Sequence, residues 1–386
     1  MLKFVLLLAL LTAFPPLATD MYLPVIPHLQ TLWQKPLAVV NLTLVLFFIT
    51  YCFFLLVYGP LSDRFGRKPP LIAGLLLFIA ASLLCAASPS INWLIGARIF
   101  QAMGAAAASA ISMAMAKDRL TSGTRERVLS QIAIIMALAP MIAPMIGSLI
   151  MDYLSWPWIF IFQAGMGMVA LVGVFKTAES HSAEQGSSIQ SLIHSYHRVL
   201  TNLRLVGVVA CNALVGLPLF AFIAGSAPIY ISRFGMDEKQ FSLFFGANAL
   251  CFMIGSMVCL RFGKRLGTLK MITIGYSGIG IGGIIMLSPL FDGPWRLALP
   301  IGLATFCLGL CRPPSNNLAL EQVGRDAGTA SSAMVFTYFV FGAFAMAGAS
   351  LQWTDKIDVI GWTALAAGGT ALTLWLLIRD RLHLPS

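Results

Sequence analysis

Residues 59–71 read GPLSDRFGRKPPL, a short stretch dense in charge, glycine and proline between two long apolar runs. Gly59 and Gly66 allow a turn and a close approach of the backbone, because glycine has no Cβ. A related pattern, RFGKR, stands at 261–265, again directly after a long apolar run. A chance match between two basic loops is one explanation. The other is a duplicated set of apolar segments, one set in each half of the chain.

The composition indicates a membrane protein. Of the 386 residues, 58% are hydrophobic and only 10% are charged, whereas a soluble globular protein carries about 25% charged residues because water must solvate its surface. The apolar runs reach about 20 residues, enough to cross a hydrocarbon core of about 30 Å. Within lipid each segment must satisfy its own backbone polar groups, so we expect helices. The alternating ten-residue segments typical of a membrane barrel are not visible.

The apolar runs predict an all-α integral membrane fold with twelve transmembrane helices in two pseudo-repeated bundles of six. The expected spans are 4–29, 38–60, 70–88, 91–115, 128–151, 156–176, 204–230, 241–260, 269–290, 296–318, 330–352 and 359–378. The longest polar segment separates six spans from six. We therefore expect an N-terminal bundle at 1–176, a cytoplasmic linker at 177–203 and a C-terminal bundle at 204–386.

The basic residues predict the orientation. Apart from Arg98 and Arg312, 18 Lys and Arg residues fall in or next to the two termini and alternate loops, against 5 in or next to the remaining loops. Loops that retain Lys and Arg stay in the cytoplasm. Both termini of this multi-pass chain should therefore lie on the cytoplasmic side of a bacterial inner membrane. This distribution also accounts for the net charge of +10 without a nucleic-acid partner.

The seven cysteines all fall in apolar segments and lack metal-ligand spacing, so neither a disulfide framework nor a metal site is expected. No nucleophile–base pair and no phosphate-binding loop is visible. We therefore expect no cofactor and no enzyme activity. An integral-membrane enzyme or receptor would need a catalytic constellation or an appended domain.

Three charged residues lie well inside the expected spans: Asp20, Arg98 and Arg312. Such charges cost several kcal/mol and usually mark a transport pathway or a proton relay. The alternative is a misplaced helix end with a snorkelling side chain. Asp20 lies roughly 13 Å from the outer end of its span, and Arg98 roughly 10 Å from the same side. We expect the two side chains to face each other at one level.

A carboxylate at this depth can bind and release a proton when helix movement changes its hydration or its distance from a guanidinium. Arg98 stays charged at any physiological pH. The sequence therefore predicts that Asp20 carries the proton and that Arg98 is its partner.

Further polar residues are candidates for a substrate cavity. Arg312 precedes two prolines and then Asn316, a polar break suited to lining a cavity, and both a substrate role and a structural role remain open for it. The candidate cavity residues are Tyr22, Asn41, Gln101, Gln163, Arg312 and Asn316. Ordinary packing is the alternative for each of them.

Four motifs resemble a known family. The loop at 59–71 resembles the signature loop between helices 2 and 3 of the major facilitator superfamily. TDMYLP at 19–24 resembles helix 1 of its bicyclomycin-resistance (Bcr/CflA) group of drug–proton antiporters. RIFQAMG at 98–104 is similar to the helix 4 motif of proton-coupled members, and AGTAS at 327–331 to the start of helix 11. The resemblance covers the full length and is stronger in the first half.

The resemblance assigns a gating role to the signature loop. Its positions in this chain are Gly59, Asp63, Arg64, Gly66 and Arg67. Asp63 can accept hydrogen bonds from a helix N-terminus, and the resemblance implies that it docks against helix 11. It also implies that Arg67 pairs with Asp118.

Drug antiporters of the superfamily carry a glycine–proline motif that kinks helix 5. Here Pro140, Pro144 and Gly147 are present, but Ala143 replaces the glycine before the proline. The kink should survive, because proline removes a helix hydrogen bond, and Ala tolerates close helix packing almost as well as Gly.

The sequence therefore predicts a proton-coupled secondary transporter that exports small amphipathic compounds, drugs or metabolites, by alternating access. Its partners would be protons, the substrate and the lipid bilayer, and we expect a monomer. The alternative is a proton-coupled importer of a small nutrient or metabolite.

Overall fold

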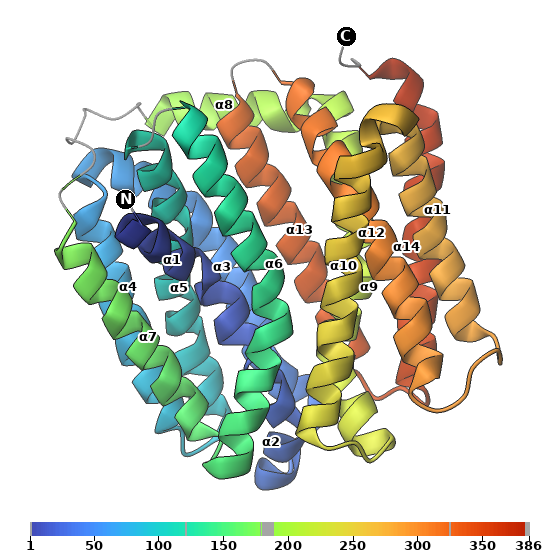
Figure 1. The fold of residues 1–386 in the computed structure, drawn as a ribbon, viewed down its shortest axis with the longest axis horizontal. Coiled ribbons are helices and arrows are strands. Elements are labelled where there is room, and N and C mark those ends of the chain that lie inside the picture. The colour runs from blue at the N-terminus through green and yellow to red at the C-terminus, as the bar shows by residue number, and fades with distance from the viewer. Residues whose placement is uncertain (1, 120–121, 178, 180–188, 324–325, 383–386) are drawn as a thin grey trace. The chain divides into compact units, whose positions relative to one another are not determined.

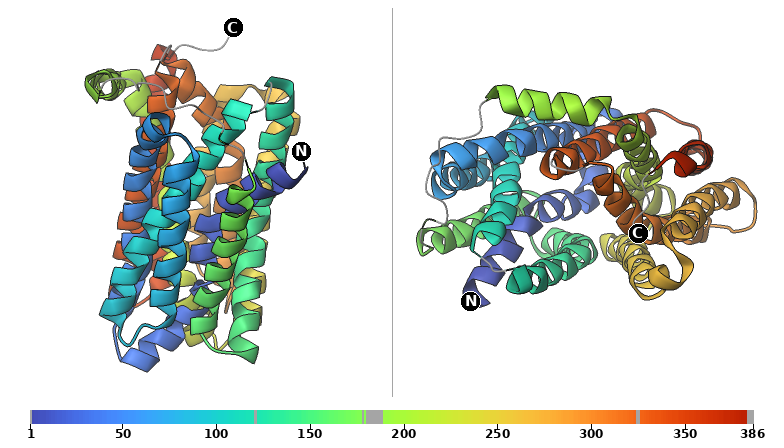
Figure 2. Two further views of the ribbon diagram at one scale, coloured as in Figure 1. Left: turned by 90° about the vertical axis from the view of Figure 1, so that its left-hand side faces the viewer. Right: turned by 90° about the horizontal axis from the view of Figure 1, so that it is seen from above.

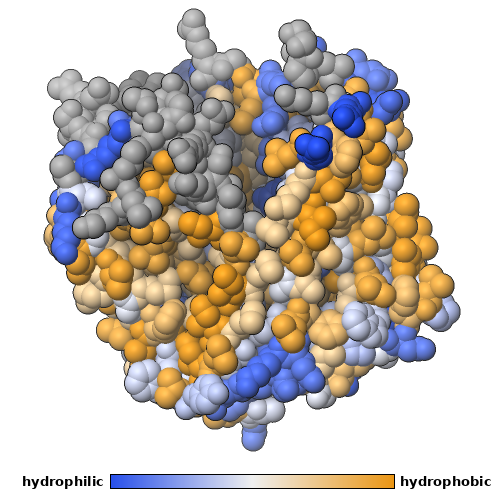
Figure 3. Space-filling view, viewed as in Figure 1, coloured by the Kyte–Doolittle hydropathy of each residue, from blue (hydrophilic) through white to orange (hydrophobic). Residues whose placement is uncertain are grey.

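A computed structural model describes residues 2–119, 122–177, 179, 189–323 and 326–382. These residues form helices joined by short connections, without strands (Figure 1). Among the described residues, eleven helical spans are long and apolar enough to cross a membrane, and Leu138–Tyr153 is a shorter apolar helix. Figure 3 shows hydrophobic residues along the middle of the helices and hydrophilic residues near their ends. The predicted all-α membrane fold is confirmed.

The chain divides into two compact units. The first unit comprises Met1–Gly186 and Asp237–Gly246. Its helices are α1 (Leu2–Asp20), a 3₁₀ turn (Leu23–Val25), α2 (Ile26–Trp33), α3 (Leu37–Phe65), α4 (Lys68–Ala86), α5 (Ile91–Arg119), α6 (Ser122–Tyr153) and α7 (Pro157–Phe175). Helix α1 packs against α5, α6 and α7, and α4 packs against α5 and α7.

The second unit comprises Ser187–Met236 and Ala247–Ser386. Its helices are α8 (Ile189–Thr201), α9 (Leu203–Ala227) with a π-helical turn (Pro228–Arg233), α10 (Glu238–Leu266), α11 (Thr268–Leu287), α12 (Trp295–Glu321), α13 (Ala327–Ala349) and α14 (Lys356–Ile378). The first residues of α10 group with the first unit. Helix α9 packs against α12, α13 and α14, and α11 packs against α12 and α14. Each of these contacts has its counterpart in the first unit, so the predicted pseudo-repeat is present.

The first predicted span is interrupted in the structure. The sequence predicts one helix over 4–29, but α1 ends at Asp20 and α2 begins only at Ile26. Pro24 and Pro27 stand at the first positions of the 3₁₀ turn and of α2. Proline has no N–H, so the carbonyls four residues earlier, of Asp20 and Leu23, lose their helical donors.

The polar segment at 177–203 contains the helix α8, which runs crosswise to the long helices of its unit (Figures 1 and 2). Arg198 of α8 forms an ion pair with Asp326 at 2.9 Å, which lowers the pKa of Asp326. Asn202 caps α9 by accepting from the backbone N–H of Arg204 and Leu205. Residues 180–188 of the expected linker lie outside the described residues, and the bundle boundaries at 176 and 204 stay a prediction.

An ion network joins three helix ends of the second unit. Asp355 accepts from Arg233 and from Arg296 at 2.8 Å, and Arg296 also pairs with Asp358 at 2.6 Å. Burial alone would raise the pKa of Asp355, but hydrogen bonds from Arg233, the Ile357 N–H and Arg296 lower it to about 2. The network connects the end of the π-helical turn with the starts of α12 and α14.

Candidate functional site

Arg98 of α5 lies at the centre of a buried polar group in the first unit. Its side chain is fully buried, and its guanidinium carbon is 4.3 Å from the centre of the Phe47 ring and 5.2 Å from that of Tyr22. Its Nη1 donates to the carbonyl oxygen of Ala18 at 3.1 Å. Ala18 lies in the last turn of α1, where carbonyls lack helical donors and the dipole is negative. Arg98 therefore caps α1 at its interruption.

Two glutamines extend this group to further helices. Gln101 accepts from Arg98 at 2.5 Å and donates to Ser82 of α4 and to Gln163 of α7, both at 2.8 Å. Gln163 in turn donates to the carbonyl oxygen of Leu17 at 3.3 Å. All four side chains are buried. The network thus joins α1, α4, α5 and α7 around the end of α1.

Asp20 is the last residue of α1 and is only 6% exposed. The Thr19 hydroxyl donates to its carboxylate at 2.9 Å. None of the ion pairs formed by the described residues includes Asp20, and its partnership with Arg98 stays a prediction. Arg98 instead binds the α1 backbone two residues earlier. Its Nη2 is buried and has no hydrogen-bond acceptor within the described part of the chain.

The structure brings two further cavity candidates to this region. Tyr22 is fully buried, and the Thr43 hydroxyl donates to its phenolic oxygen at 3.1 Å. The carbonyl oxygen of Thr43 in turn accepts from Nε of Arg98 at 3.4 Å. Asn41, also fully buried, lies two residues before Thr43 on α3. The sequence did not predict that Thr43 and Phe47 contact Arg98. Both residues lie in a long apolar run, which gives no local signal for contact with a distant arginine.

Gly147 of α6 has a packing role that the sequence did not indicate. Pro140, Pro144 and Gly147 all lie inside α6. A Cβ on Gly147 would overlap the carbonyl oxygen of Met21, which follows Asp20 directly. The glycine therefore lets α6 approach the interrupted backbone of the first membrane helix.

Arg67 is the buried centre of the signature loop. Its Nε donates to Asp118 at the end of α5 at 2.7 Å, and its Nη1 donates to Ser62 at 2.8 Å and to Asp63. Burial would lower the pKa of Arg67, but the two carboxylates raise it. The ion pair expected between Arg67 and Asp118 is thus present.

Three other loop positions differ in what they do. Gly66 adopts a φ of 84°, a region that favours glycine. A Cβ on Gly59 would meet nothing within 4 Å, so packing does not require glycine there. Arg64 is exposed, with its guanidinium carbon 5.4 Å from the centre of the Phe65 ring.

The carboxylate at the N-terminus of α4 belongs to Glu179, not to Asp63. Glu179 accepts from the backbone N–H of Arg67 and of Lys68, each at 3.0 Å. A negative charge is favoured at a helix N-terminus. No local sequence pattern indicates this contact, because Glu179 lies more than a hundred residues further along the chain.

Arg312 of α12 lies in the second unit against an aromatic cluster. Its guanidinium carbon is 3.9 Å from the centre of the Tyr338 ring of α13. The Phe220 ring of α9 is 5.2 Å from that of Tyr338. One turn after Arg312, Asn316 accepts from Asn212 of α9 at 3.2 Å. Arg312 and Asn316 thus lie where α9, α12 and α13 meet.

The helix α12 continues through Pro313 and Pro314. Pro313 cannot donate to the carbonyl oxygen of Gly309, and the Ser256 hydroxyl of α10 donates to that oxygen at 3.2 Å. A Cβ on Gly309 would overlap the backbone of Phe252 on α10. Because α10 packs this closely, its Ser256 hydroxyl replaces the backbone donor that is missing at Pro313.

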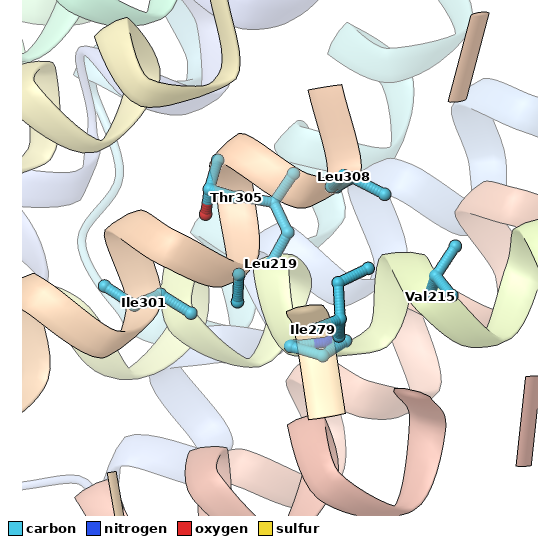
Figure 4. Close-up of a pocket in the computed structure, with 8 residues that line it drawn as sticks. Val215, Leu219, Ile279, Ile301, Thr305 and Leu308 are labelled. Atoms are coloured by element: carbon cyan, nitrogen blue, oxygen red, sulfur yellow. The ribbon is translucent and has the colours of Figure 1, made fainter. Parts of the chain in front are cut away.

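The second unit also contains a small apolar pocket between its helices (Figure 4). Helices α9, α11 and α12 line it with Val215, Pro218, Leu219, Ile279, Ile301, Ala304, Thr305 and Leu308. The Thr305 hydroxyl is buried and has no hydrogen-bond partner among the described residues.

Comparison with known proteins gives the family. Residues 8–347 match the Major Facilitator Superfamily. The chain is 29% identical over 348 residues to the bicyclomycin resistance protein homolog of Haemophilus influenzae, covering 88% of this chain and 87% of that protein. It is 25% identical over 389 residues to the multidrug resistance protein MdtL of Vibrio parahaemolyticus, covering 99% and 97%.

A solved D-xylose–proton symporter has the same fold, with a TM-score of 0.76 at 15% identity over 96% of this chain and 97% of that one. The family match spans most of the chain and agrees with the helices and the repeat described above. This multi-pass membrane protein therefore belongs to the Major Facilitator Superfamily.

Proposed function

We propose that the chain is a proton-driven exporter of small amphipathic compounds, drugs or metabolites, and that it works by alternating access. The observation that carries the proposal is the buried carboxyl of Asp20 at the interruption of the first membrane helix. Ionisable groups inside a membrane are costly and are typical of proton relays. Interrupted membrane helices are typical of the ion and substrate sites of transporters.

The arrangement around Arg98 supports a route for coupling. Asp20 follows Ala18 by two residues. Arg98 binds the Ala18 carbonyl, and its Nη2 has no acceptor among the residues that the structure describes. A small rotation of this turn would bring the ionised carboxylate of Asp20 to Nη2, and protonation would release it. Gln101, Gln163, Tyr22 and Asn41 would then line or support the substrate cavity on this side.

The signature loop would control the exchange between conformations. Arg67 holds Ser62, Asp63 and Asp118 together, and Glu179 binds the start of α4. This network can hold the cytoplasmic ends of α3, α4 and α5 as one rigid group. In this proposal Pro140, Pro144 and Gly147 let α6 bend and slide next to the interrupted first helix.

The direction of transport is inferred from the relatives. Two of them are named for bicyclomycin resistance and multidrug resistance, which favours export through a bacterial inner membrane. The excess of Lys and Arg in alternate loops supports cytoplasmic termini. We further propose a monomer that needs no cofactor.

Import is the second candidate, because the D-xylose–proton symporter shares the fold. Inverted and right-side-out vesicles distinguish the two, with bicyclomycin as the first probe. Export predicts that inverted vesicles with an acid interior accumulate the drug, and that adding the drug makes the interior less acid. Accumulation only in right-side-out vesicles would establish import. Absence of drug-dependent proton movement in both would contradict proton coupling.

A further inference from the structure

Arg312 is a cation inside a membrane helix. None of the ion pairs formed by the described residues includes it. On its own helix the next acid is Glu321, nine positions further on and therefore about 13 Å along the axis. Charges at this depth are normally paired. Unlike the fully buried Arg98, Arg312 is partly exposed, so a partner from outside the protein can reach it.

The aromatic rings beside Arg312 are held in fixed positions. A Cβ on Gly216 of α9 would overlap the Tyr338 ring, and a Cβ on Gly342 of α13 would overlap the Phe220 ring. The glycine on each helix thus leaves space for the aromatic ring of the other helix. The Phe339 ring lies 5.7 Å from Phe220 and 5.8 Å from Tyr338. The Tyr338 ring lies under the guanidinium, and the Phe220 and Phe339 rings extend this apolar surface beside it.

Amide groups complete the arrangement. Asn212 is buried, and its Nδ2 donates to Asn316 while its Oδ1 has no hydrogen-bond partner within the described residues. Asn316 lies one turn after Arg312 on α12. A guanidinium stacked on a ring keeps its edge free for the two oxygens of a carboxylate. Polar amides one turn away can accept or donate to the atoms next to that carboxylate.

We propose that this half-site of the second unit, formed by Arg312, Tyr338, Phe220, Asn212 and Asn316, selects aromatic or amphipathic carboxylic acids. The acid group binds the guanidinium of Arg312, and the apolar part of the substrate lies against the rings. The inference rests on the proposed transport function and names a substrate class for it. It differs from an unspecific apolar cavity, because it predicts that a negative charge increases affinity.

The experiment compares two probes of the same shape, 2-naphthaleneacetate and its neutral amide. Binding to the purified full-length protein in detergent is measured by equilibrium dialysis at neutral pH. A hydrogen bond to a charged group contributes enough for a preference of about tenfold or more for the acid. Arg312→Gln should abolish this preference while the affinity for the amide stays near the wild-type value. Arg312→Lys should keep part of the preference, because the charge remains.

Arg261→Gln is the matched control, since it removes one positive charge from an exposed position of α10. It should leave the preference unchanged. The proposal is overturned if the wild-type protein binds the acid no more tightly than the amide. It is equally overturned if Arg312→Gln keeps the preference, or if it loses the acid and the amide together, since Arg312 would then serve folding or coupling.

The binding measurement needs neither a proton gradient nor vesicles. Bicyclomycin export by wild-type vesicles together with an absent acid preference would therefore refute only the substrate class. An acid preference without transport of either probe would support the binding site at Arg312 and refute the proposed export.

Discussion

The guanidinium of Arg98 donates to the carbonyl oxygen of Ala18, two residues before Asp20 in the last turn of α1. The cation and the acid are therefore connected through the backbone of that turn and not through an ion pair. A rotation of the turn changes the hydration of the carboxyl and its distance from Arg98 together. In the proposed mechanism a conformational step and a proton step would therefore involve the same few atoms.

Replacing Asp20 by Asn should abolish proton-coupled transport and leave the protein folded. The amide fills the same volume and can still accept from Thr19, but it cannot release a proton. Drug-induced proton movement in inverted vesicles is the measurement. Asp292→Asn, at an exposed position, is the control and should behave as wild type. Uphill efflux by Asp20→Asn at the wild-type rate would show that another group carries the proton.

Arg98→Ala should cost both stability and transport. The change leaves the amide oxygen of Gln101 without its Arg98 donor and leaves the Ala18 carbonyl only the longer bond from Gln163 at 3.5 Å, and a buried acceptor without a partner costs about 1–3 kcal/mol. Arg98→Lys keeps the charge but not the planar fork, so it should retain part of the activity. The thermal midpoint in detergent and the pH profile of drug-induced proton release test this. A wild-type midpoint and profile for Arg98→Ala would refute the capping role.

Sequence reasoning identified the buried charged residues but not all of their neighbours. Asp20, Arg98 and Arg312 were recognisable because charge is rare in long apolar runs. Phe47 and Glu179 were not recognisable, because each is distant in sequence from the residues that it contacts. Phe47 contacts Arg98, and Glu179 contacts the start of α4. Phenylalanine is common in apolar helices, and glutamate is common in polar segments. The partnership of Asp20 and Arg98 stays a prediction, because a depth estimate along two helices gives the level of each side chain but not the rotation of either helix.

At the scale of elements, the interruption between α1 and α2 depends on its neighbour α6. Gly147 is the residue of α6 that contacts the backbone of Met21. Prolines within the first span were visible in the sequence, yet hydropathy alone predicted one continuous helix. The amphipathic helix α8 was missed for a related reason, since its apolar positions are spread through a segment that is polar on average.

Gly147→Ala should destabilise the protein and slow transport. An added methyl group would force α6 away from Met21, and overpacking of this kind costs about 1–3 kcal/mol. Gly165→Ala on α7 is the control, because a Cβ there would meet nothing within 4 Å. The thermal midpoints of the two variants in the same detergent are compared. Equal midpoints would show that α6 and the first helix can separate without cost.

The ion network of the second unit should make its stability sensitive to acid. The pKa of Asp355 is lowered to about 2, below its usual value of about 3.9. A group of this kind stabilises the fold fully above its ordinary pKa, and the stabilisation is lost as the pH falls towards 2. The thermal midpoint of the wild type should therefore decline between about pH 5 and pH 2. Asp355→Asn should have a lower midpoint at neutral pH and a weaker decline, unlike Asp292→Asn. Parallel acid profiles of wild type and Asp355→Asn would contradict this role.

At the scale of the whole molecule, the two units share a scaffold but hold different sites. Helices α5 and α12 have matching neighbours in their units, and each carries a buried or half-buried arginine. Arg98 is bound to the backbone of an interrupted helix, whereas Arg312 lies on an aromatic surface. The repeat thus provides equivalent positions for helices, and in our proposals the side chains give one unit the proton site and the other the substrate site.

The orientation of the molecule is the last prediction, and it depends on basic residues alone. The cytoplasmic side should hold the signature loop and the end of α10, and the loop between α11 and α12 should face outward. All seven native cysteines are free, and six of them are buried, so a membrane-impermeant maleimide should label them poorly. Leu290→Cys and Leu266→Cys place matched thiols at exposed positions near the end of α11 and at the end of α10. Leu290→Cys should react in intact cells, and Leu266→Cys only in inverted vesicles. The reverse pattern would place both termini outside, and it would mean that the proton enters Asp20 from the opposite side of the membrane.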